Sequence, residues 1–244
     1  MNQPEPLRRY RPLAALRALR ALARDPDDTA QVFKIVAALS GGTQLRIARR
    51  LQHSETGRRL LREARSLVPV LADRERLRSM PPDSLGRAYL AFCEQHGITA
   101  DGLIAASREG DMSALTPAEQ LAHARMRDSH DLMHVVAGYQ TDLVGEASVL
   151  ALTVAQTKNP GVALIVLLAY LRWPLRGSRK VVRQAFARGL RAAWLPEADW
   201  EALLVRPLEQ VRRELGLGNP PRYTPLWPHQ VFPNKPAPVA QATA

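Results

Sequence analysis

Four residues within one short segment have the types and the spacing of a metal-binding site: His130, Asp131, His134 and Glu146. His130 and His134 are four residues apart, so on a helix they share a face, one turn from each other. Two imidazoles placed in this way can bind one metal ion, as in the helices of zinc metalloproteases. With one or two carboxylates added, the donors suit Zn, Fe, Mn or Co, and the absence of a thiolate argues against a structural zinc finger.

Glu146 can reach the two histidines only if the helix is interrupted. It follows His134 by twelve residues, which is about 18 Å along one unbroken helix. Gly138 lies between them and can end the helix. If the chain turns there into an antiparallel helix hairpin, Glu146 and His134 lie at a similar depth from the turn. The sequence therefore predicts a metal-bearing helix hairpin.

Asp131 has two roles open to it at this site. On a helix it points about 100° away from His130, so its carboxylate either binds the ion from the side or orients a ligand. The choice matters because four protein ligands make a closed structural zinc site, whereas three leave a position for water or substrate.

Other residues with reactive side chains are weaker candidates. Cys93 lies within the helical pattern AYLAFCEQH and resembles a core residue more than an activated thiolate. His123 is expected to pack or to make an outer contact. His53, His96 and His229 lie among unrelated polar residues and are expected at the surface or at helix ends. The sequence has no GxSxG, P-loop or GxGxxG motif.

The elements that position these residues are predicted to be helices. Aromatic residues make up only 5% of the chain, whereas Ala, Leu and Arg are abundant, and this composition favours helix over sheet. The 244 residues are expected to form a basic amphipathic segment (1–26), a single compact all-α domain (27–218) and an extended Pro-rich tail (219–244).

Capping signals predict several helix boundaries. The clearest is the capping box that starts at Thr116, from which one helix is expected to run to Gly138. Further helices are expected at 101–108, at 142–157, from Pro160 until Pro174, and from Ser178 onward.

The distribution of charge helps to choose a partner class. The net charge of +11 allows nucleic acid or an anionic membrane surface. The stretch from Ala147 to Pro196 has no Asp or Glu, and its eight Lys and Arg residues lie beside the most apolar run, Val162 to Leu171. Basic residues next to an apolar surface suit a lipid interface, whereas nucleic acid would require base-stacking aromatics among the charges. We therefore expect a membrane-surface protein that binds no nucleic acid. A buried helix followed by a solvated basic helix is the structural alternative.

Further features bear on localisation. The run from Val162 to Leu171 has ten residues, and about twenty are needed to span a bilayer. With Cys93 as the single cysteine, no intrachain disulfide can form, which fits a reducing compartment. The first residues lack the apolar core of a secretory signal. We expect a protein of the bacterial cytoplasm, peripheral on the inner face of the cytoplasmic membrane. The equivalent place in a eukaryote is the matrix side of the mitochondrial inner membrane.

The segment HDLMHVVAGYQTDLVGE resembles the Coq-four family of ubiquinone biosynthesis proteins, whose hallmark is HDxxH, eleven residues and then Glu. The hallmark falls on His130, Asp131, His134 and Glu146. The segments MPPDSLGRAYLAFCEQHG (80–97) and WEALLVRPLEQVRRELGL (200–217) also resemble the family's helix entry and C-terminal pattern. The likeness covers roughly residues 28 to 224.

The resemblance implies an all-helical protein at a membrane face that binds polyprenylated aromatic lipids and other ubiquinone-biosynthesis proteins. It implies removal of the ring carboxyl at carbon 1 of a 4-hydroxy-3-polyprenylbenzoate-type substrate, either alone or coupled to hydroxylation there. Zinc is the metal we expect first, and Fe, Mn or Co are the alternatives. Glu146 and Asp131 would tune the charge at the ion or shuttle the proton that replaces the carboxyl.

The prenyl tail of such a substrate would need an apolar channel. The apolar helices after the hairpin turn offer these candidate lining residues: Leu143, Val149, Leu150, Leu164, Ile165 and Leu168. Two functions stay open, a metal-dependent decarboxylase and a non-catalytic lipid-binding scaffold that organises the ubiquinone-synthesis complex with a structural metal. The sequence leaves the oligomeric state open, and a homodimer is one option.

Overall fold

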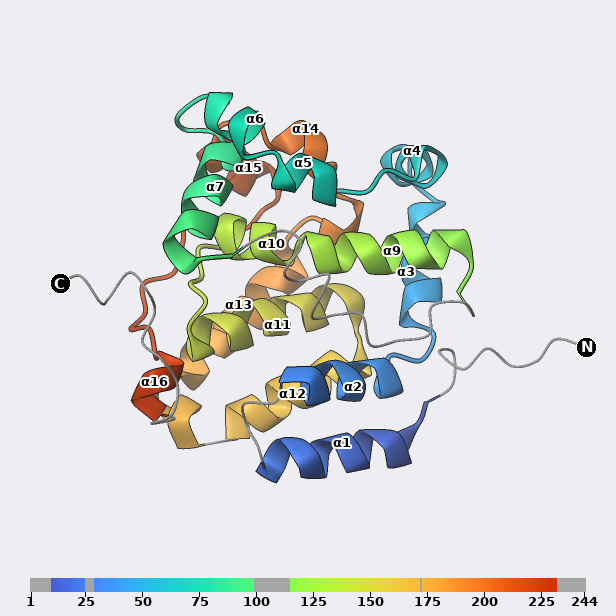
Figure 1. The fold of residues 1–244 in the computed structure, drawn as a ribbon, viewed down its shortest axis with the longest axis vertical. Helices are drawn as coiled ribbons and strands as arrows, with labels where there is room; N and C mark the ends of the chain where they lie inside the picture. Colours follow the sequence, from blue (N-terminus) through green and yellow to red (C-terminus); the bar gives the residue numbers. More distant parts are fainter. Residues whose placement is uncertain (1–9, 25–28, 99–114, 172, 232–244) are drawn as a thin grey trace, which may run out of the picture.

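The computed structural model describes residues 10–24, 29–98, 115–171 and 173–231, and in these residues the regular secondary structure is helical (Figure 1). No strand occurs in these ranges; their one isolated β-bridge joins Ser84 to Pro207. The predicted all-α single domain is thus confirmed. The helix expected at 101–108 lies outside the described residues, as do 1–9 and 232–244.

Most of the helices are short, and the longest, α11, has 15 residues. In chain order they are α1 Pro12–Arg24, α2 Thr29–Leu39, α3 Thr43–Leu51, α4 Glu55–Glu63, α5 Val68–Ala72, α6 Arg74–Ser79, α7 Leu85–His96, α9 Pro117–Asp128, α10 His130–Ala137, α11 Leu143–Thr157, α12 Pro160–Leu171, the 3-10 helix η2 Trp173–Ser178, α13 Arg179–Arg191, the 3-10 helix η3 Leu195–Glu197, α14 Trp200–Leu203, α15 Leu208–Glu214 and α16 Pro228–Val231.

The helices are stacked in tiers around α11 (Figure 1). α11 packs along α13, and α10 lies against α11 from above in this view. α12 contacts the other side of α11 and leads to α2 and α1 at the lower edge, while α7 packs on α10 from the upper tier. The main core joins buried side chains of α7, α10, α11, α13 and α14, among them Tyr89, Leu132, Leu152 and Trp200. The site helices α10 and α11 therefore lie at the centre of the packing.

Several predicted helix starts are confirmed, and a side chain caps each of them. Thr116 and Glu119 form the capping box of α9. The side chain of Asp142 accepts a hydrogen bond from the Val144 amide at the start of α11. The side-chain oxygen of Asn159 accepts from the amides of Gly161 and Val162 at the start of α12. In each case the side chain satisfies a helical N–H group that has no partner within the helix.

The prediction of one helix from Thr116 to Gly138 is wrong, because the chain breaks at Ser129. That residue has φ −87° and ψ 1°, and it separates α9 from α10. The Ser129 amide still bonds to the Arg125 carbonyl, and the Ser129 carbonyl accepts from the Met133 amide, so the break leaves these backbone groups paired. Serine has only a modest helix preference, and packing decides its conformation here. As a result, His130 is the first residue of a new helix.

The Pro-rich tail is described as far as Val231. Residues 220–227 form no regular structure, as expected, and α16 adds one short helical turn after them. Tyr223 and Leu226 pack against the main core. Among the described residues, no helix combines the length and the hydropathy that crossing a membrane requires.

Replacing Gly189 with Ala should destabilise the contact between α13 and α11. A Cβ at Gly189 would lie 2.8 Å from the Leu152 carbonyl oxygen and 2.9 Å from the Ala155 Cβ. We expect the free energy of unfolding to fall by about 1–2 kcal/mol, after the gain in helix propensity is included. Urea unfolding measures this loss. Gly177→Ala is the control, since a Cβ there meets no atom within 4 Å. Equal stability of the two variants would contradict the close packing.

Candidate metal centre

The two helices that carry the site are joined by a turn over residues 138–142. Gly138 has φ +76°, a left-handed conformation that favours glycine, and the amides of Gly138 and Tyr139 both bond to the His134 carbonyl. Asp142 then caps α11, and α10 and α11 run in opposite directions (Figure 1). This places His134 in the last turn of one helix and Glu146 in the first turn of the next.

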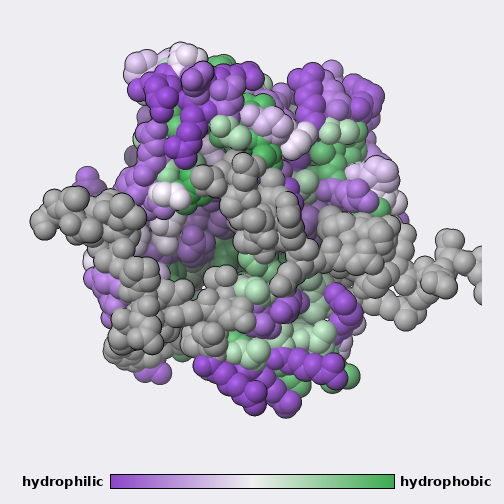
Figure 2. All heavy atoms as spheres, in the orientation of Figure 1, coloured by the Kyte–Doolittle hydropathy of each residue, from purple (hydrophilic) through white to green (hydrophobic). Residues whose placement is uncertain are grey.

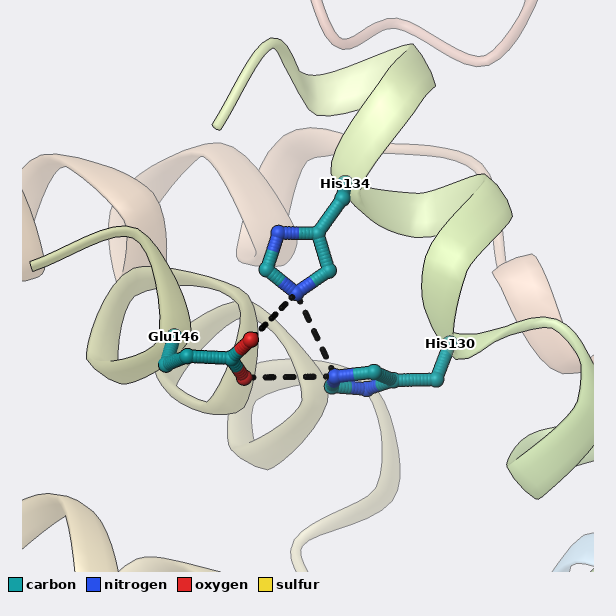
Figure 3. Close-up of side chains that lie close together, drawn as sticks. All are labelled: His130, His134 and Glu146. Carbon is teal, nitrogen blue, oxygen red and sulfur yellow. Dashed lines mark hydrogen bonds and ion pairs between the residues drawn. The ribbon is translucent and has the colours of Figure 1, made fainter. Parts of the chain in front are cut away.

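Three side chains converge between these helices: His130, His134 and Glu146 (Figure 3). The two Nε2 atoms are 3.2 Å apart, and Glu146 Oε2 and Oε1 lie 3.4 Å from His130 Nε2 and His134 Nε2, respectively. The ligands of a tetrahedral zinc ion, at bond lengths of about 2.0–2.1 Å, are about 3.3 Å from one another. The donor atoms therefore already have the spacing that one ion needs, and the group could bind a metal.

The orientation of His134 supports the same role. Its Nδ1 lies 3.3 Å from the Tyr139 carbonyl oxygen. A carbonyl oxygen can only accept, so Nδ1 carries a proton, and Nε2, which faces Glu146 and His130, is the ring nitrogen that can bind a cation. Metal-binding histidines are commonly held in this way, with the second ring nitrogen donating to a carbonyl or carboxylate.

The electrostatics of the group favour a negative carboxylate. Burial opposes the charge on Glu146, but the two imidazoles outweigh burial and hold the pKa of Glu146 well below its ordinary range. Burial also opposes the charge on His130, yet the hydrogen bond and the charge of Glu146 raise the pKa of His130 above 6.5. Both shifts have the same cause, which is that the site gains stability from positive charge beside Glu146.

Asp131 lies outside this group of ligand atoms. Its side chain is buried, and burial raises the pKa of Asp131 although the charges of His130 and His134 oppose the shift. Its charge also acts on Cys93 of α7, where burial is the main factor that raises the pKa of the thiol to about 11. Cys93 is thus a buried, protonated thiol, as its position in the sequence indicates.

His96 belongs to the surroundings of the site, which the sequence did not indicate. It is the last residue of α7, and its Nε2 and Nδ1 lie 3.0 Å from Gln140 Oε1 and Thr141 Oγ1, respectively. Its ring is 4.7 Å from the ring of Phe92, which in turn stacks on His134 at 5.7 Å. The contacts of His96 with Gln140 and Thr141 join residues 44 and 45 positions apart, a separation over which local sequence patterns give no signal.

Two arginines fix the C-terminal end of α10. Arg212 donates to the carbonyls of Val135 and Val136, and Arg188 donates to the carbonyl of Ala137. The last carbonyls of a helix have no partner within it, so these guanidinium groups satisfy them and hold the turn that carries His134.

The remaining histidines lie apart from the metal group. His123 Nδ1 is 3.4 Å from Gln44 Nε2, and His53 is exposed. His229 lies on α16. Among the described residues, His130, His134 and Glu146 form the one group of this kind.

The comparisons with known proteins decide the family. The model of the family described as "Coenzyme Q (ubiquinone) biosynthesis protein Coq4" matches residues 9–221 of the chain. The chain belongs to the Coq4 family. The resemblance inferred from the segment around His130 is thus confirmed, and the chain is a ubiquinone biosynthesis protein of this family.

Curated Coq4 relatives include "Ubiquinone biosynthesis protein COQ4, mitochondrial" of Lodderomyces elongisporus, which is 30% identical over 201 residues, or 77% of this chain and 52% of the relative. The protein of the same name from Zygosaccharomyces rouxii is 32% identical over 171 residues, or 68% and 50% of the two chains. The chain thus spans about half the length of these two relatives. It covers 76% of the Schizosaccharomyces japonicus relative, at 29% identity.

A solved structure shares the Coq4-family fold. The crystal structure of a candidate ubiquinone biosynthesis protein from Nostoc punctiforme superposes with a TM-score of 0.66 at 20% sequence identity. The match covers 86% of this chain and 100% of the other. At this identity the likeness shows the fold alone.

Metal affinity of this Coq4-family chain should fall as the pH falls through the raised pKa of His130. Both imidazoles must be neutral to bind, so below that pKa each unit of pH should weaken Co(II) binding by about tenfold. Calorimetric titration between about pH 8 and pH 6 measures this dependence. The exposed His53→Ala variant is the control and should match the unmodified chain. Affinity that is independent of pH would contradict the ligand assignment.

Proposed function

We propose that this chain is a metal-dependent carboxy-lyase of ubiquinone biosynthesis. It removes the ring carboxyl at carbon 1 of a 4-hydroxy-3-polyprenylbenzoate-type substrate at a membrane surface. The observation that carries the proposal is the converged group of His130, His134 and Glu146 in a chain of the Coq4 family. Three protein ligands leave a coordination position for a substrate oxygen, which is the arrangement of catalytic sites.

The donor set fits a divalent cation, with zinc first and Fe, Mn or Co as alternatives. When bound, the ion supplies a Lewis acid for the negative charge that develops on the ring as carbon dioxide leaves. Glu146 is the anionic ligand in this scheme, because its low pKa keeps it ionised. The negative charge of Glu146 also sets how strongly the bound ion acts as a Lewis acid.

Asp131 is our candidate for the proton donor. Its raised pKa keeps the buried carboxyl closer to protonation than an ordinary aspartate. The carbon that loses carbon dioxide must take up a proton, and an acid with a raised pKa is suited to supply it. In the oxidative variant a hydroxyl from dioxygen takes that place, and a two-electron reductant must be supplied so that the second oxygen atom leaves as water; the test is therefore run with and without oxygen and reductant.

The candidate tail-binding residues fall into two groups. Leu150, Leu164, Ile165 and Leu168 are half-buried, and Leu143 is partly buried against the main core. Val149 is fully buried in that core and supports α11 from within. The proposal keeps the half-buried residues of α11 and α12 as the wall of an apolar channel.

The surface of α12 and α1 supports association with an anionic membrane, which we place at the inner face of the cytoplasmic membrane. On α12, Leu167 and Leu171 are 51% and 56% exposed, and on α1, Leu13 is 71% exposed beside Arg17 and Arg20. Figure 2 shows hydrophobic and hydrophilic side chains side by side over this lower edge of the molecule. Exposed apolar side chains that alternate with arginines suit a headgroup interface.

A non-catalytic scaffold is the second candidate. The observation that favours it is α12, a strongly apolar helix whose buried residues are only Gly161 and Val162. Such a helix could hold a prenyl lipid and contact other ubiquinone-biosynthesis proteins, with the metal serving structure alone.

Release of carbon dioxide from a carboxyl-labelled polyprenyl-hydroxybenzoate tests the catalytic proposal. We expect His134→Ala to abolish both metal binding and carbon dioxide release. Asp131→Asn should keep the metal and lower the rate by about 100-fold or more, since it removes the proton donor. His53→Ala should leave both quantities unchanged.

If the metal-loaded protein releases no carbon dioxide with or without oxygen, the catalytic proposal fails. The scaffold then predicts that removing the metal lowers the melting temperature sharply while bound lipid is retained.

The double variant Leu167→Glu and Leu171→Glu should bind vesicles of anionic lipid at least about tenfold more weakly, because it removes two apolar contacts and adds like charge. Co-sedimentation with the vesicles measures this change. Val205→Glu is the matched control, since Val205 is 49% exposed just beyond α14. Equal binding of both variants would place the membrane contact elsewhere.

A further inference from the structure

The turn between α10 and α11 is covered by a segment from the far end of the chain. Residues 219–227, which we call the strap, run beside this turn (Figure 1). Pro220 lies so close to Gly138 that a Cβ on Gly138 would be 2.5 Å from the Pro220 Cβ. The ring of Tyr223 lies 5.9 Å from the ring of Tyr139. The strap is thus packed directly on the turn.

Asp142 is the point at which the strap is tied to the hairpin. Its fully buried carboxylate accepts hydrogen bonds from the Val144 amide (2.9 Å), the Leu226 amide (2.9 Å) and the Tyr223 hydroxyl (2.6 Å). The Tyr223 hydroxyl in turn accepts from the Gln140 amide at 2.8 Å. One tyrosine hydroxyl therefore links the middle of the turn to the cap of α11.

A second tie joins the strap to the first turn of α11, and α7 holds the turn from another side. The Leu143 amide donates to the Leu226 carbonyl at 2.9 Å. His96 contacts the side chains of Gln140 and Thr141, and its ring is 6.1 Å from that of Trp227 on the strap. The turn is therefore fixed by groups that lie far away in the sequence.

The position of Glu146 depends on this turn. The Glu146 amide donates to the Asp142 carbonyl at 2.8 Å, so the ligand lies one helical turn after the tied cap. His134 lies in the last turn of α10, directly before residues 138–142. Any change in the path of residues 138–142 therefore alters the spacing between the carboxylate and the imidazoles.

We propose that the strap positions Glu146 against the two histidines and that Tyr223 is the positioning residue, acting through Asp142. The proposal rests on the proposed metal site. Two of its residues, Tyr223 and Leu226, lie just beyond residue 221, where the Coq4 match ends. Groups that orient a ligand from behind in this way typically alter metal affinity by about 10- to 100-fold when removed.

The test compares Tyr223→Phe with Tyr139→Phe in the full chain. The first keeps the ring and removes the hydroxyl that joins Gln140 to Asp142. The second removes the hydroxyl of a buried neighbouring tyrosine, which lies beside Arg188 and makes no hydrogen bond to Asp142 or to the turn. Co(II) titration well below the melting temperature should show a dissociation constant about tenfold or more higher for Tyr223→Phe. Tyr139→Phe should stay within about twofold of the unmodified chain.

The visible spectrum of bound Co(II) separates positioning from general stability. Partial loss of Glu146 changes the coordination and thus the spectrum of Tyr223→Phe, whereas a variant that is only less stable keeps the original spectrum. Unchanged affinity and spectrum in Tyr223→Phe would overturn the proposal. If Tyr223→Phe does not fold, Asp142→Asn is measured in the same way with the same expected outcomes.

One further outcome distinguishes this proposal from the proposed function. If the unmodified chain binds no Co(II), the metal-dependent function fails, and the strap is judged by hydrogen exchange at the Glu146 amide. Faster exchange in Tyr223→Phe than in Tyr139→Phe supports the strap, and equal exchange in the two variants overturns it.

Discussion

The arrangement around the site depends on one interaction, the approach of the Glu146 carboxylate to the Nε2 atoms of His130 and His134. The two Nε2 atoms and the two carboxylate oxygens lie 3.2–3.4 Å from their neighbours. At this spacing their lone pairs repel one another unless positive charge lies between them. A proton or a metal ion supplies that charge, so the fold holds the groups ready for a cation. The opposite pKa shifts of Glu146 and His130 express the same constraint.

Holding such a group together requires support from elements that bear no ligand. The carbonyls at the end of α10 are satisfied by Arg188 and Arg212, and the turn is held by α7 and the strap. Burying the polar groups of these supporting elements costs free energy, and the hydrogen bonds that they form with the helix end and the turn offset this cost. A rigid environment of this kind fixes the spacing of the ligands before any cation is bound.

The two carboxylates near the site differ in their tendency to ionise, and this difference suggests a division of roles. Glu146 faces both imidazoles and has a depressed pKa, whereas Asp131 is buried beside α7 and has a raised pKa. Environments that separate two neighbouring carboxyl pKa values are typical of sites in which one group binds and the other carries a proton. This division fits the decarboxylation that we propose for this chain, in which a ring carboxyl is exchanged for a proton.

The sequence by itself determined the local features: the all-α class, the capping box at Thr116, the Gly138 turn and the identity of the histidine pair. These follow from short-range rules, since helical periodicity and capping act over about four residues. Tertiary packing decided the break at Ser129, the contacts of His96 and the path of the strap over the turn. It also decided that Asp131 lies outside the ligand group while Glu146 enters it. Such contacts join residues far apart in the chain, and their free energy comes from burial and hydrogen bonding that no local pattern encodes.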